Sequence, residues 1–103
     1  MTESVNVGRT GDIEQGAMKL VEVGERKLAI VNVGGKFYAI DNLCSHRGGP
    51  LSEGTLEGDV VECPWHGSKF NVATGERLDG PAQGGVQSFT LRVEGADLIV
   101  EIP

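Results

Sequence analysis

The chain contains two cysteines and two histidines, and they occur as two pairs in its middle part. Cys44 and His46 form the first pair, Cys63 and His66 form the second, and residues 47–62 separate them. Thiolate and imidazole groups are ligands for zinc and for iron–sulfur centres, whereas calcium and magnesium take oxygen ligands. A small domain also gains stability from a bound metal, because its hydrophobic core is limited. The pattern therefore favours a metal centre where two loops meet.

The order of the four ligands along the chain distinguishes two kinds of centre. Structural zinc sites usually place the two cysteines together and the two histidines together. Here the order is Cys, His, Cys, His, which suits an asymmetric two-iron cluster. Each loop then supplies one ligand to each iron: Cys44 and Cys63 hold one iron, and His46 and His66 hold the other. A structural zinc module without a redox role stays open as an alternative, and a disulfide is disfavoured in a cytosolic protein.

On both sides of this middle part, the sequence consists of short apolar runs that glycine-containing turns interrupt. The runs alternate with period two, are rich in β-branched residues and show no helical period. Gly34 and Gly35 lie between two such runs and predict a two-residue hairpin, with a weaker signal at Gly24 and a further hairpin at residues 94–97. The sequence therefore predicts an all-β fold with strands at residues 17–23, 28–33, 36–40, 86–93 and 98–102.

The middle part differs from these flanks, because it holds every cysteine and histidine and three of the four prolines. Only residues 60–61 and 69–72 in it have the character of strands. We therefore expect a single domain spanning residues 1–103, with an inserted, loop-rich cluster-binding subdomain at about residues 42–82. Its glycines 48, 49, 54, 67 and 80 are expected at positions where the backbone conformation or a close approach of the backbone requires glycine. Its small core is expected to contain Leu51, Val60, Val61 and Phe70.

The charge and hydropathy of the chain exclude several classes of partner. The formal net charge of −6 would repel a nucleic-acid backbone or an anionic membrane surface. No apolar stretch approaches the roughly 18 residues of a membrane span, and no secretory signal begins the chain, so a cytoplasmic location is expected. Residues 41–80 carry seven acidic and three basic side chains, a net charge of −4. This is either an ordinary solvated surface or an acidic rim that steers a basic partner.

Two segments, CSHRGGPLSEG and CPWHGSKFNVATGE, resemble the two cluster-binding boxes of the Rieske iron–sulfur family. The resemblance extends to Gly80-Pro81-Ala82, which is similar to the proline loop that covers the cluster in that family, and to residues 86–102. It implies a Rieske-like antiparallel β-sandwich or barrel framework with one [2Fe-2S] cluster at its tip. The cluster ligands would be Cys44, His46, Cys63 and His66, and the activity would be one-electron transfer.

Three absences narrow the kind of Rieske protein that the resemblance implies. High-potential members have an extra cysteine in each box, and here Trp65 and Gly49 or its neighbours stand at those positions. Oxygenase large subunits hold a further iron, for which this chain has no histidines left. No Gly-x-Gly-x-x-Gly motif follows a strand, so a reductase must supply the electron.

What remains resembles a ferredoxin that carries electrons from a flavin-containing reductase to a terminal ring-hydroxylating oxygenase and is not itself an enzyme. A small subunit of another redox complex, such as a nitrite reductase, is the close alternative.

Three residues near the expected cluster have roles that the resemblance suggests. Ser68 matches a serine whose hydroxyl bonds to cluster sulfur in high-potential members, although it could instead bond only to backbone. Trp65 is either a partner contact or a packing residue, and Pro81 belongs to the proline loop. Phe70 replaces a tyrosine of high-potential members. With no inter-loop disulfide and an acidic chain, the potential is expected toward the lower end of roughly −150 to +300 mV.

Overall fold

The structure is a computed structural model, and it describes residues 3–42, 50–64, 67–80 and 84–102. Within these ranges the regular structure is ten strands and two 3₁₀ helices of three residues each. The expectation of an all-β fold with little helix is therefore confirmed. No helix in the described ranges has the length and apolar character needed to cross a membrane.

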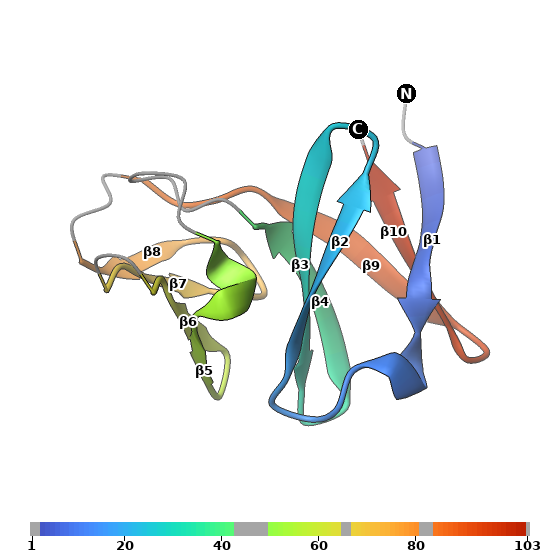
Figure 1. Cartoon of the computed structure of the whole chain (residues 1–103), viewed down its shortest axis with the longest axis horizontal. Helices are drawn as coiled ribbons and strands as arrows, with labels where there is room; N and C mark the ends of the chain where they lie inside the picture. Colours follow the sequence, from blue (N-terminus) through green and yellow to red (C-terminus); the bar gives the residue numbers. More distant parts are fainter. Residues whose placement is uncertain (1–2, 43–49, 65–66, 81–83, 103) are drawn as a thin grey trace.

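Six strands form a large antiparallel sheet that curls on itself (Figure 1). Their order is β1 (Glu3–Arg9), β10 (Asp97–Ile102), β9 (Ser88–Glu94), β4 (Lys36–Asp41), β3 (Arg26–Val33) and β2 (Met18–Val23). The 3₁₀ helix η1 (Thr10–Asp12) follows β1, and β1 and β2 at the two ends of the order come into contact. This large sheet is the framework of the molecule.

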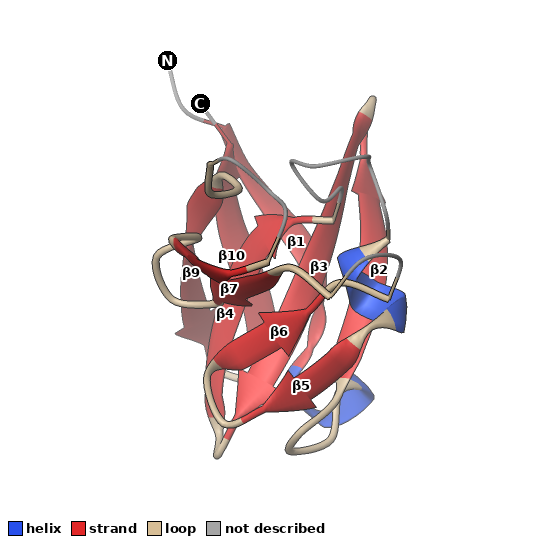
Figure 2. Cartoon of the chain, turned by 90° about the vertical axis from the view of Figure 1, so that its left-hand side faces the viewer, coloured by secondary structure: helices blue, strands red, loops and turns tan. Residues whose placement is uncertain are grey.

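Four short strands form a second antiparallel sheet at one side of the framework. Their order is β5 (Thr55–Glu57), β6 (Val60–Glu62), β7 (Lys69–Asn71) and β8 (Arg77–Asp79), and η2 (Leu51–Glu53) precedes them. Figure 2 shows this small sheet in front of the framework strands β3 and β4. All four strands lie between residues 42 and 82, and the description of that segment as a subdomain of a single domain stays a prediction.

Strand β3 connects the two sheets because both of its faces are buried. Successive side chains of a strand point to opposite faces. Leu28 and Ile30 pack inside the curled framework, while Ala29 and Val31 pack toward the small sheet, and all four are fully buried. The buried side chains on the second side form what we call the inter-sheet cluster: Ala29, Val31, Ile40, Leu51, Val61, Cys63, Phe70 and Val72.

The turns follow the glycine pattern of the sequence. Gly34 and Gly35 have φ of 59° and 93° and form the two-residue turn between β3 and β4, as predicted. Gly24 and Gly95, with φ of 61° and 62°, lie in the turns of the other two expected hairpins. The expectation that Val60 is part of the small core is wrong. Val60 is half-buried, because it lies on the opposite face of β6 from Val61.

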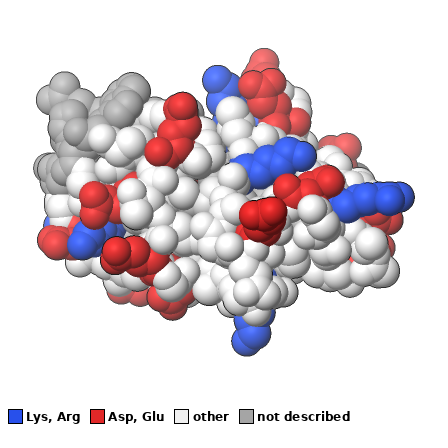
Figure 3. Space-filling view, turned by 60° about the horizontal axis from the view of Figure 1, so that its bottom comes forward, with Lys and Arg blue, Asp and Glu red and all other residues white. Residues whose placement is uncertain are grey.

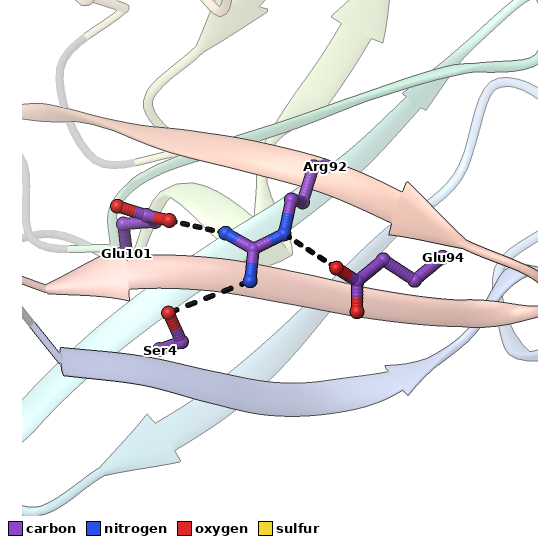
Figure 4. A network of polar contacts seen from close by, with 4 residues as sticks. All are labelled: Ser4, Arg92, Glu94 and Glu101. Carbon is purple, nitrogen blue, oxygen red and sulfur yellow. Dashed lines mark hydrogen bonds and ion pairs between the residues drawn. The ribbon is translucent and has the colours of Figure 1, made fainter.

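The framework strand β9 carries a charged side chain that contacts three other residues (Figure 4). The Arg92 guanidinium donates to Glu94 at 2.9 Å, to Glu101 on β10, and to the Ser4 hydroxyl on β1 at 3.5 Å. Its hydrogen bond to Glu94, and then that to Glu101, raise the pKa of Arg92. Because the group is exposed, this network contributes little to stability, and it lies apart from the candidate site.

Candidate metal centre

The second Cys/His pair belongs to the loop at the tip of the β6–β7 hairpin. Glu62 and Lys69 are the last paired residues of the two strands, and residues 63–68 connect them. The Cys63 N–H donates to the Ser68 carbonyl at 2.8 Å, and the Gly67 N–H donates to the Cys63 carbonyl at 3.2 Å. Gly67 has a φ of +77°, which favours glycine. We call residues 63–68 the ligand loop. The two backbone hydrogen bonds just described hold Cys63 at the start of this loop, next to the end of β6.

Two predicted site residues in the ligand loop are buried. Cys63 is 3% exposed and belongs to the inter-sheet cluster, whereas Ser68 is completely buried. Both lie where the small sheet meets the framework. The Cys63 thiol thus lies in an apolar environment sheltered from water, and the Ser68 side chain is enclosed five residues further along the chain.

The first Cys/His pair follows a residue that the sequence analysis did not single out. Asn42 is 2% exposed, and its N–H donates to the Lys27 carbonyl at 2.8 Å. Its backbone carbonyl accepts from the Leu51 N–H at 2.7 Å, and its side-chain Oδ1 accepts from the Ser52 N–H at 2.8 Å. Asn42 thus joins the two ends of the segment that contains the first pair. An asparagine beside a loop is a signal for such local backbone bonding.

The chain segments next to the two loops touch each other. A Cβ atom at Gly54 would lie 2.0 Å from the carbonyl oxygen of Glu62 and 3.2 Å from that of Leu51. Only glycine fits here, as predicted, because any side chain would overlap backbone atoms. The last residue of the first box therefore packs directly on the strand that leads into the ligand loop. This contact supports the expectation that both boxes lie at one end of the molecule.

Five of the predicted site residues lie outside the described residues. They are Cys44, His46, Trp65, His66 and Pro81. The assignment of four ligands, and the roles suggested for Trp65 and Pro81, therefore stay predictions. So do the disulfide alternative and the glycines at 48 and 49, which involve undescribed positions.

The surface at this end of the molecule carries mainly acidic side chains. Figure 3 shows acidic side chains on both ends of the visible face, whereas most of the Lys and Arg side chains lie at the end away from the undescribed residues. Lys69 is a cation within this region, and its Nζ lies 3.8 Å from Glu62 Oε1 at the base of the ligand loop. The charge pattern agrees with the net negative charge of residues 41–80.

A curled antiparallel framework with a small second sheet, whose hairpin presents a buried cysteine in a Cys-x-x-His loop, is typical of one class of iron–sulfur protein. The family model of the Rieske [2Fe-2S] domain matches residues 3–90. The chain belongs to this family, and it holds one [2Fe-2S] cluster per chain. Family membership and cofactor are thus as the sequence predicted.

Relatives with curated names fall into two kinds. The chain is 42% identical over 93 residues to the ferredoxin component of biphenyl 2,3-dioxygenase from Rhodococcus jostii (strain RHA1), covering 90% of this chain and 87% of the relative. It is 40% identical over 83 residues to apoptosis-inducing factor 3 from Mus musculus, covering 81% of this chain but 14% of that protein.

Among solved structures, the chain resembles the complex of reduced oxygenase and oxidized ferredoxin in carbazole 1,9a-dioxygenase. The TM-score is 0.89 at 39% identity, over 94% of this chain and 91% of the matched chain.

The residues of this chain fit the cluster that the family implies. Two thiolates and two imidazoles are the donor set of a Rieske centre. Cys63, the one of the four that the structure describes, lies in a turn with its side chain sheltered from water. The ligand loop also has the positive φ at Gly67 that allows a tight return of the backbone.

Proposed function

We propose that the chain is a Rieske ferredoxin that carries one electron at a time from a flavin-containing reductase to a terminal ring-hydroxylating oxygenase. In this proposal Cys44 and Cys63 hold one iron, and His46 and His66 hold the other. The observation that carries it is the match along almost the whole length of a dioxygenase ferredoxin component. The related complex of ferredoxin and oxygenase supports the oxygenase as one partner. The reductase and a cytoplasmic location rest on the sequence.

The cluster supplies a centre that gains and loses one electron, and the protein supplies its ligands, its surroundings and a docking surface. The backbone bonds of the ligand loop fix Cys63, so the ligand does not need to move between two oxidation states. The inter-sheet cluster keeps water from the Cys63 side chain. The acidic end of the molecule offers complementary charge to a basic partner surface.

A second function has one observation in its favour. The similarity to apoptosis-inducing factor 3 covers only a small part of that protein. A Rieske domain of this kind thus also occurs within a larger chain, which is consistent with permanent attachment in another redox complex, such as a nitrite reductase. Copurification separates the two functions, since a transient carrier is isolated alone and a subunit is isolated with its enzyme.

The test of the proposed function is an electron paramagnetic resonance spectrum of the dithionite-reduced protein, purified without oxygen. A two-iron cluster with mixed ligands is expected to give a rhombic signal with a lower average g value than an all-cysteine cluster. Reduced protein should then pass its electron to a ring-hydroxylating oxygenase in a stopped-flow mixture. A silent spectrum with stoichiometric zinc and no labile sulfide would make the chain a structural zinc module instead.

Ser68→Ala is expected to lower the midpoint potential. Ser68 is fully buried and its carbonyl already bonds to Cys63, so its hydroxyl is well placed for the sulfur bond that the family resemblance suggests. Hydrogen bonds to sulfur stabilise the reduced, more negative cluster. A net contribution of about 1 kcal/mol corresponds to a decrease of roughly 40 mV for a one-electron couple. Spectroelectrochemical titration measures the decrease, with Ser88→Ala on β9 as the control. An unchanged midpoint would mean that the hydroxyl bonds only to backbone.

A further inference from the structure

Gly80, the residue after β8, packs its backbone directly on the ligand loop. A Cβ atom at this position would lie 2.4 Å from Ser68 Cα, 2.9 Å from Ser68 N and 3.0 Å from the Gly67 carbonyl oxygen. All three neighbours are backbone atoms, so a change of side-chain rotamer cannot relieve the overlap. Gly80 also has a φ of +96°, in the region that favours glycine. The contact therefore exists only because residue 80 has no side chain.

Neighbouring side chains hold Gly80 in this position. Arg77 Nη2 donates to the Gly80 carbonyl at 2.6 Å, and the Gly80 N–H donates to Asp79 Oδ1 at 2.8 Å. Asp79 itself is paired with Lys69, the residue after Ser68, in the β7–β8 ladder. A larger residue at position 80 would have to break these bonds or displace Ser68.

A displacement of Ser68 would reach the cysteine of the ligand loop. The Ser68 carbonyl accepts the hydrogen bond from the Cys63 N–H, and both residues are buried. Phe70 and Val61 on the neighbouring positions of the small sheet are also fully buried, so Cys63 and Ser68 are surrounded by packed side chains. Close-packed interiors transmit such shifts.

We infer that Gly80 is a positioning residue for electron transfer: its backbone contact with Ser68 holds the ligand loop in place and thereby sets the midpoint potential of the cluster. The inference rests on the proposed function, since it needs the cluster at Cys63. Among the described residues, the atoms nearest to a Cβ at position 80 belong to the backbone of Ser68 and Gly67, so Gly80 acts through Ser68.

Gly80→Ala tests the inference, with Gly35→Ala as a matched control. Gly35 has nearly the same φ, +93°, but nothing lies within 4 Å of its Cβ position. Both variants place an alanine at a similar positive φ, and only Gly80→Ala overlaps another part of the chain. We expect Gly80→Ala to lower the midpoint potential in redox titration, and Gly35→Ala to leave it at the wild-type value while lowering the melting temperature.

A Gly80→Ala potential equal to that of Gly35→Ala would overturn the inference, because the two variants differ in whether the new side chain overlaps the backbone of Ser68.

Arg77→Gln provides a second variant, should Gly80→Ala fail to fold. It removes the bond to the Gly80 carbonyl together with one positive charge, and Lys69→Gln removes a positive charge from the neighbouring strand as its control. We expect a larger decrease in potential for Arg77→Gln, and equal decreases would contradict the inference. A wild-type protein without a Rieske spectrum would instead refute the proposed function, so the two failures are distinguishable.

Discussion

Cys63→Ser is expected to remove the cluster from a chain that still folds around the same core. Serine has nearly the shape of cysteine, so the inter-sheet cluster loses little packing when Cys63 is replaced. A hydroxyl is a much poorer ligand for iron–sulfur clusters, which are held by thiolates. Because mutation of even the outer partners of metal ligands costs roughly 10- to 100-fold in affinity, loss of a ligand itself should weaken cluster binding at least that much and lower the cluster content. Visible absorbance and iron content of the anaerobically purified variant measure the loss.

The same variant should also be less stable to heat, because a group that binds only the folded chain stabilises it by mass action. Cys63→Ala is the companion variant. If Cys63 were only a buried apolar residue, Cys63→Ser could lower the stability through its buried hydroxyl, but both replacements would leave the colour of the protein unchanged. Retention of full cluster content in either variant would exclude Cys63 as a ligand.

The sequence predicts those parts of the framework in which buried side chains or glycine turns give a recognisable local pattern. Strand β3 is recognisable because its run from Leu28 to Val31 is apolar on both faces, and the structure buries all four residues. The turn at Gly34 and Gly35 is recognisable because two adjacent positive φ angles require glycine. These features depend on local sequence, so one chain is enough to find them.

Other strands cannot be predicted from the sequence, because pairing with neighbouring strands stabilises them and their residues show no regular apolar pattern. Strand β1 has only Val5 and Val7 as apolar residues, and it forms because β10 supplies its hydrogen bonds across a bulge between Asn6 and Gly8. Strands β5 and β8 have three residues each, and all three residues of β8 are exposed. Contacts between residues distant in sequence determine such strands, and they leave no period to detect.

The sequence likewise reveals one part of the candidate site and not another. The two Cys/His pairs stand out because their residue types are rare in this chain and their chemistry is specific. The partners of the residues that hold the loops do not stand out. Asn42 and Gly54 act through backbone contacts with Ser52 and Glu62, and nothing in the residue types alone reveals those partners.

Phe70→Ala is expected to give the largest loss of stability of any single core replacement in the small sheet. Among the residues that the structure describes, Phe70 is the largest fully buried side chain, and it lies on β7 opposite Val61. Truncation of a buried phenylalanine to alanine costs roughly 3–5 kcal/mol, because contacts are lost and a cavity remains. That is a substantial part of the roughly 5–15 kcal/mol by which a native protein is usually stable. Guanidinium unfolding followed by far-UV circular dichroism measures the effect.

Leu78→Ala on the neighbouring strand β8 is the control for this prediction. Leu78 is 46% exposed, so its truncation should change the free energy of unfolding by about 0.5 kcal/mol or less. The comparison of Phe70→Ala with Leu78→Ala tests whether the inter-sheet cluster attaches the small sheet to the framework. Strands of three residues are too short to form a stable sheet alone, so β5–β8 depend on packing against β3 and β4. If Phe70→Ala were no more destabilising than Leu78→Ala, the inter-sheet cluster could not be what attaches the ligand loop to the framework.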